Sequence, residues 1–173
     1  ISENREIQLY GAYHPLLLKH NQDQNLSTFP QDILIKDEMR ILVISGPNAG
    51  GKSITLKTMG ILQLMFQSGI LIPTHPKSKI FIFDQILTDI GDNQSIENQL
   101  STYSYRLKNM KYFLENCNKE TLFLIDEFGT GSDPELGGAL AEVFLKEFYD
   151  SGAFGIITTH YSNLKVMASE LDF

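Results

Sequence analysis

Residues 40–67 place a glycine-rich loop between an apolar run and a helical pattern. The run Arg40–Ser45 is almost wholly apolar, which is typical of a strand in the middle of a parallel sheet that is covered on both faces. From Lys52 to Gln67 apolar residues recur at spacings near three and four, and Gly69 stands where a helix would stop. This spacing predicts a helix. A strand, a glycine turn and a helix in this order predict an α/β domain.

The loop fits the pattern G-x-x-x-x-G-K-[ST]. Its residues are Gly46, Pro47, Asn48, Ala49, Gly50, Gly51, Lys52 and Ser53. Glycines let successive backbone N–H groups face one anion, and the helix that follows adds the positive end of its dipole. Lys52 would supply a fixed cation for the β- and γ-phosphates of a nucleotide, and the Ser53 hydroxyl would ligate Mg²⁺. The alternative is a glycine-rich turn with an incidental lysine.

Two further groups of polar residues follow apolar strand candidates. The run Thr121–Ile125 leads into Asp126 and Glu127, and Phe154–Thr159 leads into His160. The carboxyl ends of parallel strands are where α/β proteins bind ligands. We therefore expect Asp126 to hold Mg²⁺, Glu127 to act as general base toward a water, and His160 to contact the γ-phosphate or that water. The alternatives are an exposed acidic pair and a structural histidine.

The remaining pattern completes the predicted architecture. We expect a pair of strands with turns over Ile7–Leu18, and single strands at Ile33–Ile35 and Ile80–Phe83. A surface loop is expected at 21–25. Helices are expected at Ser101–Asn116 and Glu135–Tyr149. Strands that alternate with helices predict a three-layer α/β fold with a mostly parallel core sheet, preceded by an antiparallel N-terminal β part. We expect one domain over 1–173, with a β subregion at 1–38 and a nucleotide-binding core at 39–173.

Residues 93–102 are polar and precede a predicted helix, with Ser101 as its N-cap. A serine-capped helix N-terminus is also a site that can meet a phosphate. The sequence alone does not say whose phosphate that would be.

Composition limits the classes of protein that fit. The chain has 173 residues, with 14 Lys+Arg and 21 Asp+Glu, and a net charge of −7. Because binding to phosphates needs a basic surface, this segment is not expected to bind nucleic acid by itself. The single cysteine, Cys117, cannot form an internal disulfide and lacks partners for a cysteine-based metal site, so we expect a reducing, cytoplasmic location. No apolar run reaches the roughly 18 residues of a membrane span, and no membrane partner is expected.

Four motifs in one order resemble the ATPase domain of the MutS family. They are the loop Gly46–Ser53, the segment Ser101-Thr102-Tyr103, the segment Asp126-Glu127-Phe128-Gly129-Thr130-Gly131, and Thr159-His160-Tyr161. The resemblance extends from about Tyr10 to Leu164. The segments 89–97 and 129–134 are similar to the second bacterial branch of the family, which is not the mismatch-recognition branch. The mismatch-repair branch usually carries arginine where Thr130 stands.

The resemblance implies a fold, an activity and partners. The family fold is an ABC-type P-loop ATPase that uses ATP and Mg²⁺ and works as a homodimer with two composite sites. By resemblance, Ser101 of one subunit would complete the site around Lys52 of the other, and His14 and Phe29 would lie near the adenine base. The second branch is associated with branched DNA, with suppression of recombination and, in some bacteria, with rescue of stalled ribosomes. We expect this chain to be a fragment of a longer protein whose other regions contact the polymer.

Two rival functions remain open at this point. The first is another P-loop class such as a GTPase or a small-molecule kinase. A GTPase should carry Asn-Lys-x-Asp for guanine, whereas Asn118-Lys119 continues as Glu120-Thr121. The second rival is a nucleotide-gated dimerisation module with negligible turnover.

Overall fold

The computed structural model describes residues 1–46, 51–91, 99–130 and 134–170. The chain forms two compact units, one from residues 1–37 and 53–82 and the other from residues 38–52 and 83–173. Each unit is described by itself below. No helix in the described ranges is long and apolar enough to cross a membrane.

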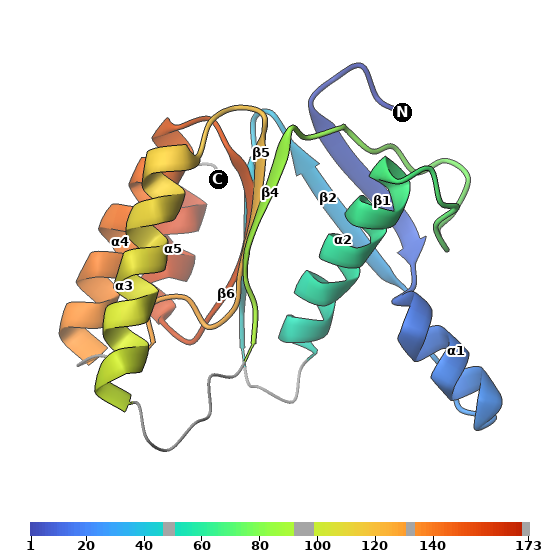
Figure 1. Cartoon of the computed structure of the whole chain (residues 1–173), viewed down its shortest axis with the longest axis horizontal. Coiled ribbons are helices and arrows are strands. Elements are labelled where there is room, and N and C mark those ends of the chain that lie inside the picture. Colours follow the sequence, from blue (N-terminus) through green and yellow to red (C-terminus); the bar gives the residue numbers. More distant parts are fainter. Residues whose placement is uncertain (47–50, 92–98, 131–133, 171–173) are drawn as a thin grey trace. The chain divides into compact units, whose positions relative to one another are not determined.

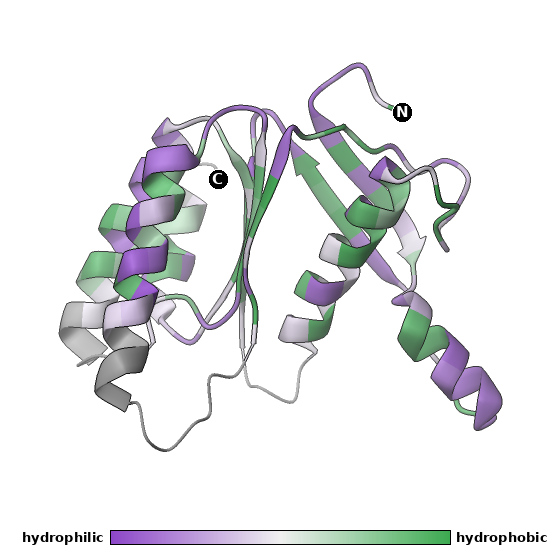
Figure 2. Cartoon of the chain, viewed as in Figure 1, coloured by the Kyte–Doolittle hydropathy of each residue, from purple (hydrophilic) through white to green (hydrophobic). Residues whose placement is uncertain are grey.

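The first unit contains a two-stranded antiparallel sheet and two helices. Strand β1 (Glu6–Ala12) pairs with β2 (Gln31–Lys36), so that Ile7 lies opposite Ile35 and Leu9 opposite Ile33. These four side chains are buried, as the two-residue period of a half-covered sheet requires. Helices α1 (Pro15–Asp23) and α2 (Lys52–Gln67) complete the unit, to which α2 belongs from Ser53 onward. The apolar residues of α2 appear green in Figure 2.

Two local predictions in this part of the sequence are wrong. Residues 15–23 form α1 where the sequence predicted strand and loop, because Pro15 at the first helical position has the backbone angle that a helix start needs. Ile80–Phe83 is not a strand, although Ile80 and Phe83 are buried. The Lys79 backbone instead exchanges two hydrogen bonds with Gln8 in an isolated bridge, and the Ile80 carbonyl accepts one from the Ser2 N–H, so the apolar run reflects burial rather than pairing within a sheet.

The second unit is built on a four-stranded parallel sheet in the order β3-β6-β5-β4. The strands are β3 (Ile41–Ser45), β4 (Gln85–Asp89), β5 (Thr121–Ile125) and β6 (Phe154–Thr159). Every residue of β5 and β6 is buried, as expected of central parallel strands. The predictions of an α/β fold, a mostly parallel core sheet and an antiparallel N-terminal β part are confirmed.

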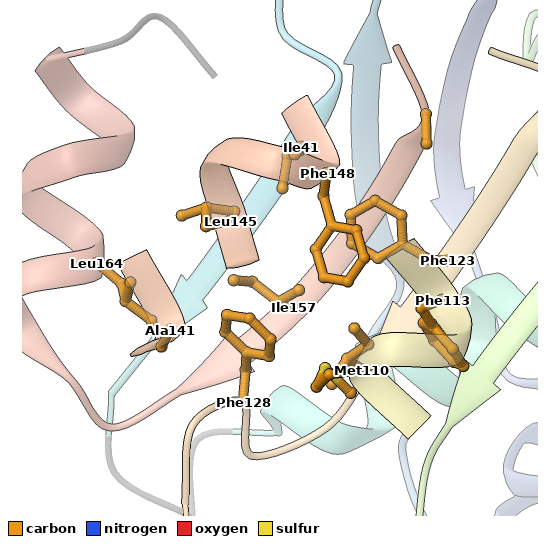
Figure 3. Close-up of a cluster of buried hydrophobic side chains, with 12 residues drawn as sticks. Ile41, Met110, Phe113, Phe123, Phe128, Ala141, Leu145, Phe148, Ile157 and Leu164 are labelled. Carbon is orange, nitrogen blue, oxygen red and sulfur yellow. The ribbon is translucent and has the colours of Figure 1, made fainter. Parts of the chain in front are cut away.

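Helices α3 (Gln99–Asn116), α4 (Pro134–Asp150) and α5 (Ser162–Glu170) pack on one face of this sheet (Figure 1). The core between them and the sheet is rich in phenylalanine (Figure 3). Its buried members are Ile41, Met110, Phe113, Phe123, Ile125, Phe128, Ala141, Leu145, Phe148, Ala153, Ile157 and Leu164. The rings of Phe123 and Phe148 lie 4.7 Å apart between centroids. This core fixes the helices relative to the strand ends that carry the site.

Gly155 leaves room for Phe123, one of the four phenylalanines of that core. It is buried in β6 and pairs with Phe123 of the neighbouring strand β5. A Cβ at position 155 would lie 2.1 Å from Cζ of the Phe123 ring, far inside van der Waals contact. The ring therefore occupies the space that any larger residue at 155 would need.

Helix α3 is also fixed at its C-terminal end. The side-chain amide of Gln85, the first residue of β4, donates to the Asn116 carbonyl at 2.6 Å and to Thr121 Oγ1 at 2.9 Å. The last turn of α3 is thereby joined to the amino ends of β4 and β5.

Candidate functional site

The parallel register brings three predicted segments to one edge of the sheet. In the ladder Ser45 lies beside Thr159, and Ile125 lies beside Ile157. Gly46, the pair Asp126-Glu127 and His160 therefore all follow the carboxyl ends of adjacent strands. This edge is the position that the sequence predicted for the site, and it is where open α/β sheets bind ligands.

The glycine-rich loop joins β3 to α2. Gly46 and Gly51 have φ angles of +148° and +79°, which non-glycine residues rarely adopt. Pro47, Asn48, Ala49 and Gly50 lie outside the described residues. Lys52 opens α2 and is only 5% exposed, and its Nζ donates to the Gly46 carbonyl. A buried ammonium at a helix N-terminus is an arrangement suited to phosphate. Ser53 follows in α2, and its role as a Mg²⁺ ligand stays a prediction.

Thr158 of β6 holds both acidic residues at the end of β5. Its hydroxyl donates to Asp126 Oδ1 and accepts from the Glu127 N–H at 2.8 Å. The Phe128 N–H adds a bond of 2.7 Å to the Thr158 carbonyl. One hydroxyl therefore orients the predicted metal ligand and the backbone of the predicted general base together.

Glu127 has an unusual backbone conformation. Its φ angle is +52°, in the left-handed region that costs a non-glycine residue of order 1–3 kcal/mol. Its carbonyl accepts from Thr130 N at 3.2 Å, Thr130 Oγ1 at 2.8 Å and Arg106 Nη1 at 2.9 Å. These three donors stabilise the turn that begins at Glu127.

Sequence reasoning missed Arg106. It lies on α3, and its Nη1 also contacts Thr130 Oγ1 at 2.6 Å. Its partners are a backbone carbonyl and a hydroxyl, which leave no motif in a sequence. The one available signal was a basic residue beside the predicted apolar stripe of this helix, next to Leu107.

Asp89, at the end of β4, is a half-buried carboxyl near this group. Burial raises the pKa of Asp89, while the charge of Arg106 and a hydrogen bond from Asn109 partly oppose that rise, and the charge of Asp126 adds to it. The Asp126 N–H donates to the Asp89 carbonyl at 2.9 Å. A cavity of about 40 Å³ lies here, lined in part by Asp89, Arg106, Phe128 and Thr130.

His160 is exposed, and the residues on either side of it are anchored. Thr159 Oγ1 donates to the Phe128 carbonyl at 3.1 Å and accepts from the Tyr161 N–H at 3.1 Å. The Tyr161 hydroxyl donates to the Gly129 carbonyl at 3.1 Å. His160 is therefore attached to a backbone whose neighbouring residues are hydrogen-bonded to the turn after Glu127. Its role stays a prediction.

Ser101 lies within α3 rather than before it. The helix begins at Gln99, so Ser101 is its third residue, and the N-cap prediction is wrong. Gln99 and Leu100 are good helix formers whose side chains do not compete for backbone bonds, so the helix continues past the serine toward the N-terminus. The predicted contact of Ser101 with a second subunit's nucleotide remains untested.

The two residues that resemblance assigned to the adenine base lie in the first unit. His14 is the N-cap of α1, where Nδ1 accepts from the Leu17 N–H at 3.4 Å. Phe29 is 84% exposed, between α1 and β2. His14 therefore has a structural task in α1, and contact of either residue with a base stays a prediction.

We expect the His14 cap to fail in acid. Burial first, and then the positive charge of Lys57, lower the pKa of His14 below its usual value. Only a neutral Nδ1 can accept from Leu17, so the cap is intact above pH about 6.5 and is lost as the pH falls through the lowered pKa. The protection factor of the Leu17 amide, from which the intrinsic pH dependence of exchange has been divided out, should fall between pH 7 and pH 5. His14→Asn caps without titrating, and an unchanged response in that variant would contradict the assignment.

The donor set at the sheet edge fits a magnesium nucleotide. Magnesium sites commonly use one or two carboxylates and complete their shell with substrate phosphates and water. Asp126 carries such a carboxylate at the sheet edge, and a hydroxyl ligand from Ser53 stays a prediction. The described residues contain no cluster of three or more His, Cys, Asp or Glu side chains, so an all-protein cage for a metal is not found among them. Cys117 is no nucleophile, because burial raises its pKa to about 12.

Comparison with known proteins decides the family. Residues 42–173 match the family profile of MutS domain V. The chain belongs to the MutS family. Its relatives include proteins named endonuclease MutS2 from Lacticaseibacillus casei, 45% identical over 96% of this chain and 20% of the relative, and from Pediococcus pentosaceus, 47% identical over 98% and 21%. A third, from Finegoldia magna, is 46% identical over 97% and 21%.

These relatives confirm the predicted resemblance to the second MutS branch, because each of them carries the MutS2 name. The MutS domain spans about one fifth of the length of these curated relatives. The word endonuclease in their names therefore describes proteins about five times as long. MutS domain V is a P-loop ATPase domain, which agrees with the α/β fold and the loop between β3 and α2.

Proposed function

We propose that this MutS domain binds ATP and hydrolyses it at the carboxyl edge of the parallel sheet. The observation that carries the proposal is that Gly46, the Asp126-Glu127 pair and His160 follow the carboxyl ends of three adjacent strands, with Lys52 bonded to the Gly46 carbonyl. Phosphoryl transfer to water requires a fixed cation that binds the phosphates, a carboxylate that holds Mg²⁺, and a second carboxylate that orients the attacking water.

Each residue has a separate task in this proposal. The loop from Gly46 to Gly51 and the ammonium of Lys52 bind the phosphates, and bound Mg²⁺, held by Ser53 and Asp126, neutralises their charge. Glu127 accepts the proton of the attacking water, and His160 contacts the γ-phosphate or that water. Thr158 fixes the acidic pair, so that little reorganisation is left for the reaction itself.

We further propose that two copies of the domain share each site. A single lysine and one helix end leave a triphosphate exposed on one side, and the N-terminal end of α3 from a second copy, with Ser101 in its first turn, would cover it. MutS-family proteins generally dimerise, which supports this arrangement. A phenyl ring exposed as Phe29 is would suit stacking on the base, and His14 would lie nearby.

Replacing Lys52 tests the proposal most directly. Lys52→Ala removes the buried cation beside Gly46, and we expect ATP affinity to fall by a factor of about 100 or more. Binding of a fluorescent ATP analogue, with GTP as competitor, measures the loss and the choice of base. The exposed Lys57→Ala of the same helix is the matched control. Unchanged affinity in Lys52→Ala would overturn the proposal.

Mixing variants tests the shared site with the same proteins. Lys52→Ala and Ser101→Ala are each expected to be nearly inactive alone. A mixed dimer would contain one site with both Lys52 and Ser101 intact, so turnover should return to a measurable fraction of wild type. If no mixture recovers activity, the sharing of sites is excluded. ATP-dependent dimers without turnover in the wild type would favour a nucleotide-gated dimerisation module instead.

The wider role of the domain is a further part of the proposal, and it rests on the resemblance to the second MutS branch. We propose that nucleotide-dependent association of two domains drives action on branched DNA or on stalled ribosomes in the cytoplasm. The net charge of −7 supports leaving contact with either polymer to other regions.

A further inference from the structure

We propose that Arg106 is a positioning residue for Glu127 and that it makes the geometry of Glu127 depend on the position of helix α3. The inference rests on the proposed function, in which Glu127 accepts a proton from the attacking water. It concerns a residue outside the loop and outside the acidic pair.

The first argument is the backbone of Glu127. A glutamate at φ +52° occupies a region that its Cβ disfavours, so neighbouring groups must stabilise the turn. Arg106 Nη1 donates to the Glu127 carbonyl at 2.9 Å and to Thr130 Oγ1 at 2.6 Å. An arginine is always charged and holds its donors in a rigid plane, so these bonds are stronger and more directional than neutral ones. Arg106 therefore fixes the peptide that sets the direction of the Glu127 side chain.

The second argument is the location of Arg106 among the ends of two strands. Its charge interacts favourably with the Asp89 carboxylate at the end of β4, to which Asn109 of the same helix also bonds. The Asp89 carbonyl in turn accepts from the Asp126 N–H. Arg106 thus interacts with the ends of β4 and β5 at once. Arg106 is half buried, and it lines the cavity together with Met110, Ile125 and Phe128.

The third argument is the helix that carries Arg106. It follows Ser101 by five residues, about 7.5 Å along the helix axis. In the proposed dimer the N-terminal end of α3 meets the nucleotide of the second copy. A movement of that end reaches Arg106 through a continuous helix, and Arg106 transmits it to the turn after β5 through one hydrogen bond to Glu127 and one to Thr130. Glu127 would therefore be aligned in one site when α3 has engaged the other.

A merely structural arginine would stabilise the domain without changing the reaction, and kinetics distinguish the two. Arg106→Gln removes the charged donor and Arg106→Lys keeps the charge, while Lys111→Gln removes a charge from the exposed face of the same helix. We expect Arg106→Gln to lower kcat by a factor of about 10 to 100 with KM for ATP changed less than about threefold, and Arg106→Lys to recover part of kcat. Lys111→Gln should match wild type.

Amide exchange at Thr130 gives a readout that does not depend on turnover. The Thr130 N–H bonds to the Glu127 carbonyl, and its exchange should accelerate by a factor of about 10 in Arg106→Gln and stay unchanged in Lys111→Gln. Faster exchange with unchanged kcat would make Arg106 structural only and overturn the inference. Unchanged exchange would overturn it even if kcat fell. A wild type without turnover would remove the proposed function, and the exchange of Thr130 would still decide whether Arg106 holds the turn.

Discussion

Glu127→Gln is expected to lower ATP turnover by a factor of about 100 or more while ATP remains bound. A positioned general base contributes roughly 10²–10⁴ to a rate, and glutamine keeps the size of glutamate without its basicity. The backbone bonds of residue 127 to Thr158 and Thr130 do not involve the side chain, so the turn should be preserved. Single-turnover hydrolysis and ATP affinity measured on the same protein separate the two effects.

A matched control excludes a general effect of charge. Glu147→Gln removes the same charge from an exposed position of α4 and should leave turnover within about twofold of wild type. Near-normal turnover in Glu127→Gln would remove Glu127 from the mechanism and leave His160 as the residue to test next. Loss of ATP affinity together with turnover would instead point to damage in the loop.

Gly155→Ala is expected to destabilise the domain by about 3 kcal/mol, at the upper end of the range for overpacked cores. The new methyl group would lie within 2.5 Å of three atoms of the Phe123 ring. That ring is fully buried and lies against Phe148, so it has no free space to move into. Strand β6 is also paired on both sides, so the backbone cannot shift alone. Urea denaturation, with the midpoint and slope compared to wild type, measures the change.

A second substitution shows whether the ring is the cause. Phe123→Leu alone should cost stability by removing buried apolar surface. In Gly155→Ala with Phe123→Leu, the smaller side chain would make room for the methyl group, so the two costs should be less than additive by about 1 kcal/mol or more. A free energy of unfolding for Gly155→Ala within about 0.5 kcal/mol of wild type, or strict additivity in the double variant, would contradict this account.

The sequence predicted those parts of the fold that depend on continuous apolar runs. Strands β3, β5 and β6 were predicted with nearly their observed bounds because each is a continuous apolar run, although only β5 and β6 are buried along their whole length. Strand β4 was missed because its residues are only partly buried and polar at both ends, whereas the run at 80–83 is more apolar but unpaired. Helix α1 was missed because the His14-Pro15 pair was interpreted as a turn, although proline is well tolerated at a first helical position.

The candidate site shows a similar division. Lys52 was predicted from the glycine-rich loop pattern, and Asp126, Glu127 and His160 were predicted because a sequence indicates where a strand ends and the carboxyl ends of parallel strands converge. The roles of these residues stay predictions. The support for these residues was not predictable. Thr158 and Arg106 act on backbone atoms of Glu127, and the left-handed conformation that they stabilise depends on tertiary contacts, which no local pattern encodes.

The attachment of α3 at its C-terminal end defines a pivot for the helix. Its last turn is held through the Asn116 carbonyl by Gln85, so in the proposed dimer a push on the first turn would tilt the helix about that point. Arg106 stands 10 residues from this pivot and Ser101 stands 15, so about two-thirds of a displacement at Ser101 arrives at Arg106. A shift of about 1.5 Å at the first turn would thus become about 1 Å at the bond from Arg106 to Glu127, which is comparable to the tolerance of a hydrogen bond. The length of α3 between Arg106 and its C-terminal attachment would therefore determine how strongly nucleotide binding in one subunit of the proposed dimer changes the position of Glu127 in the other.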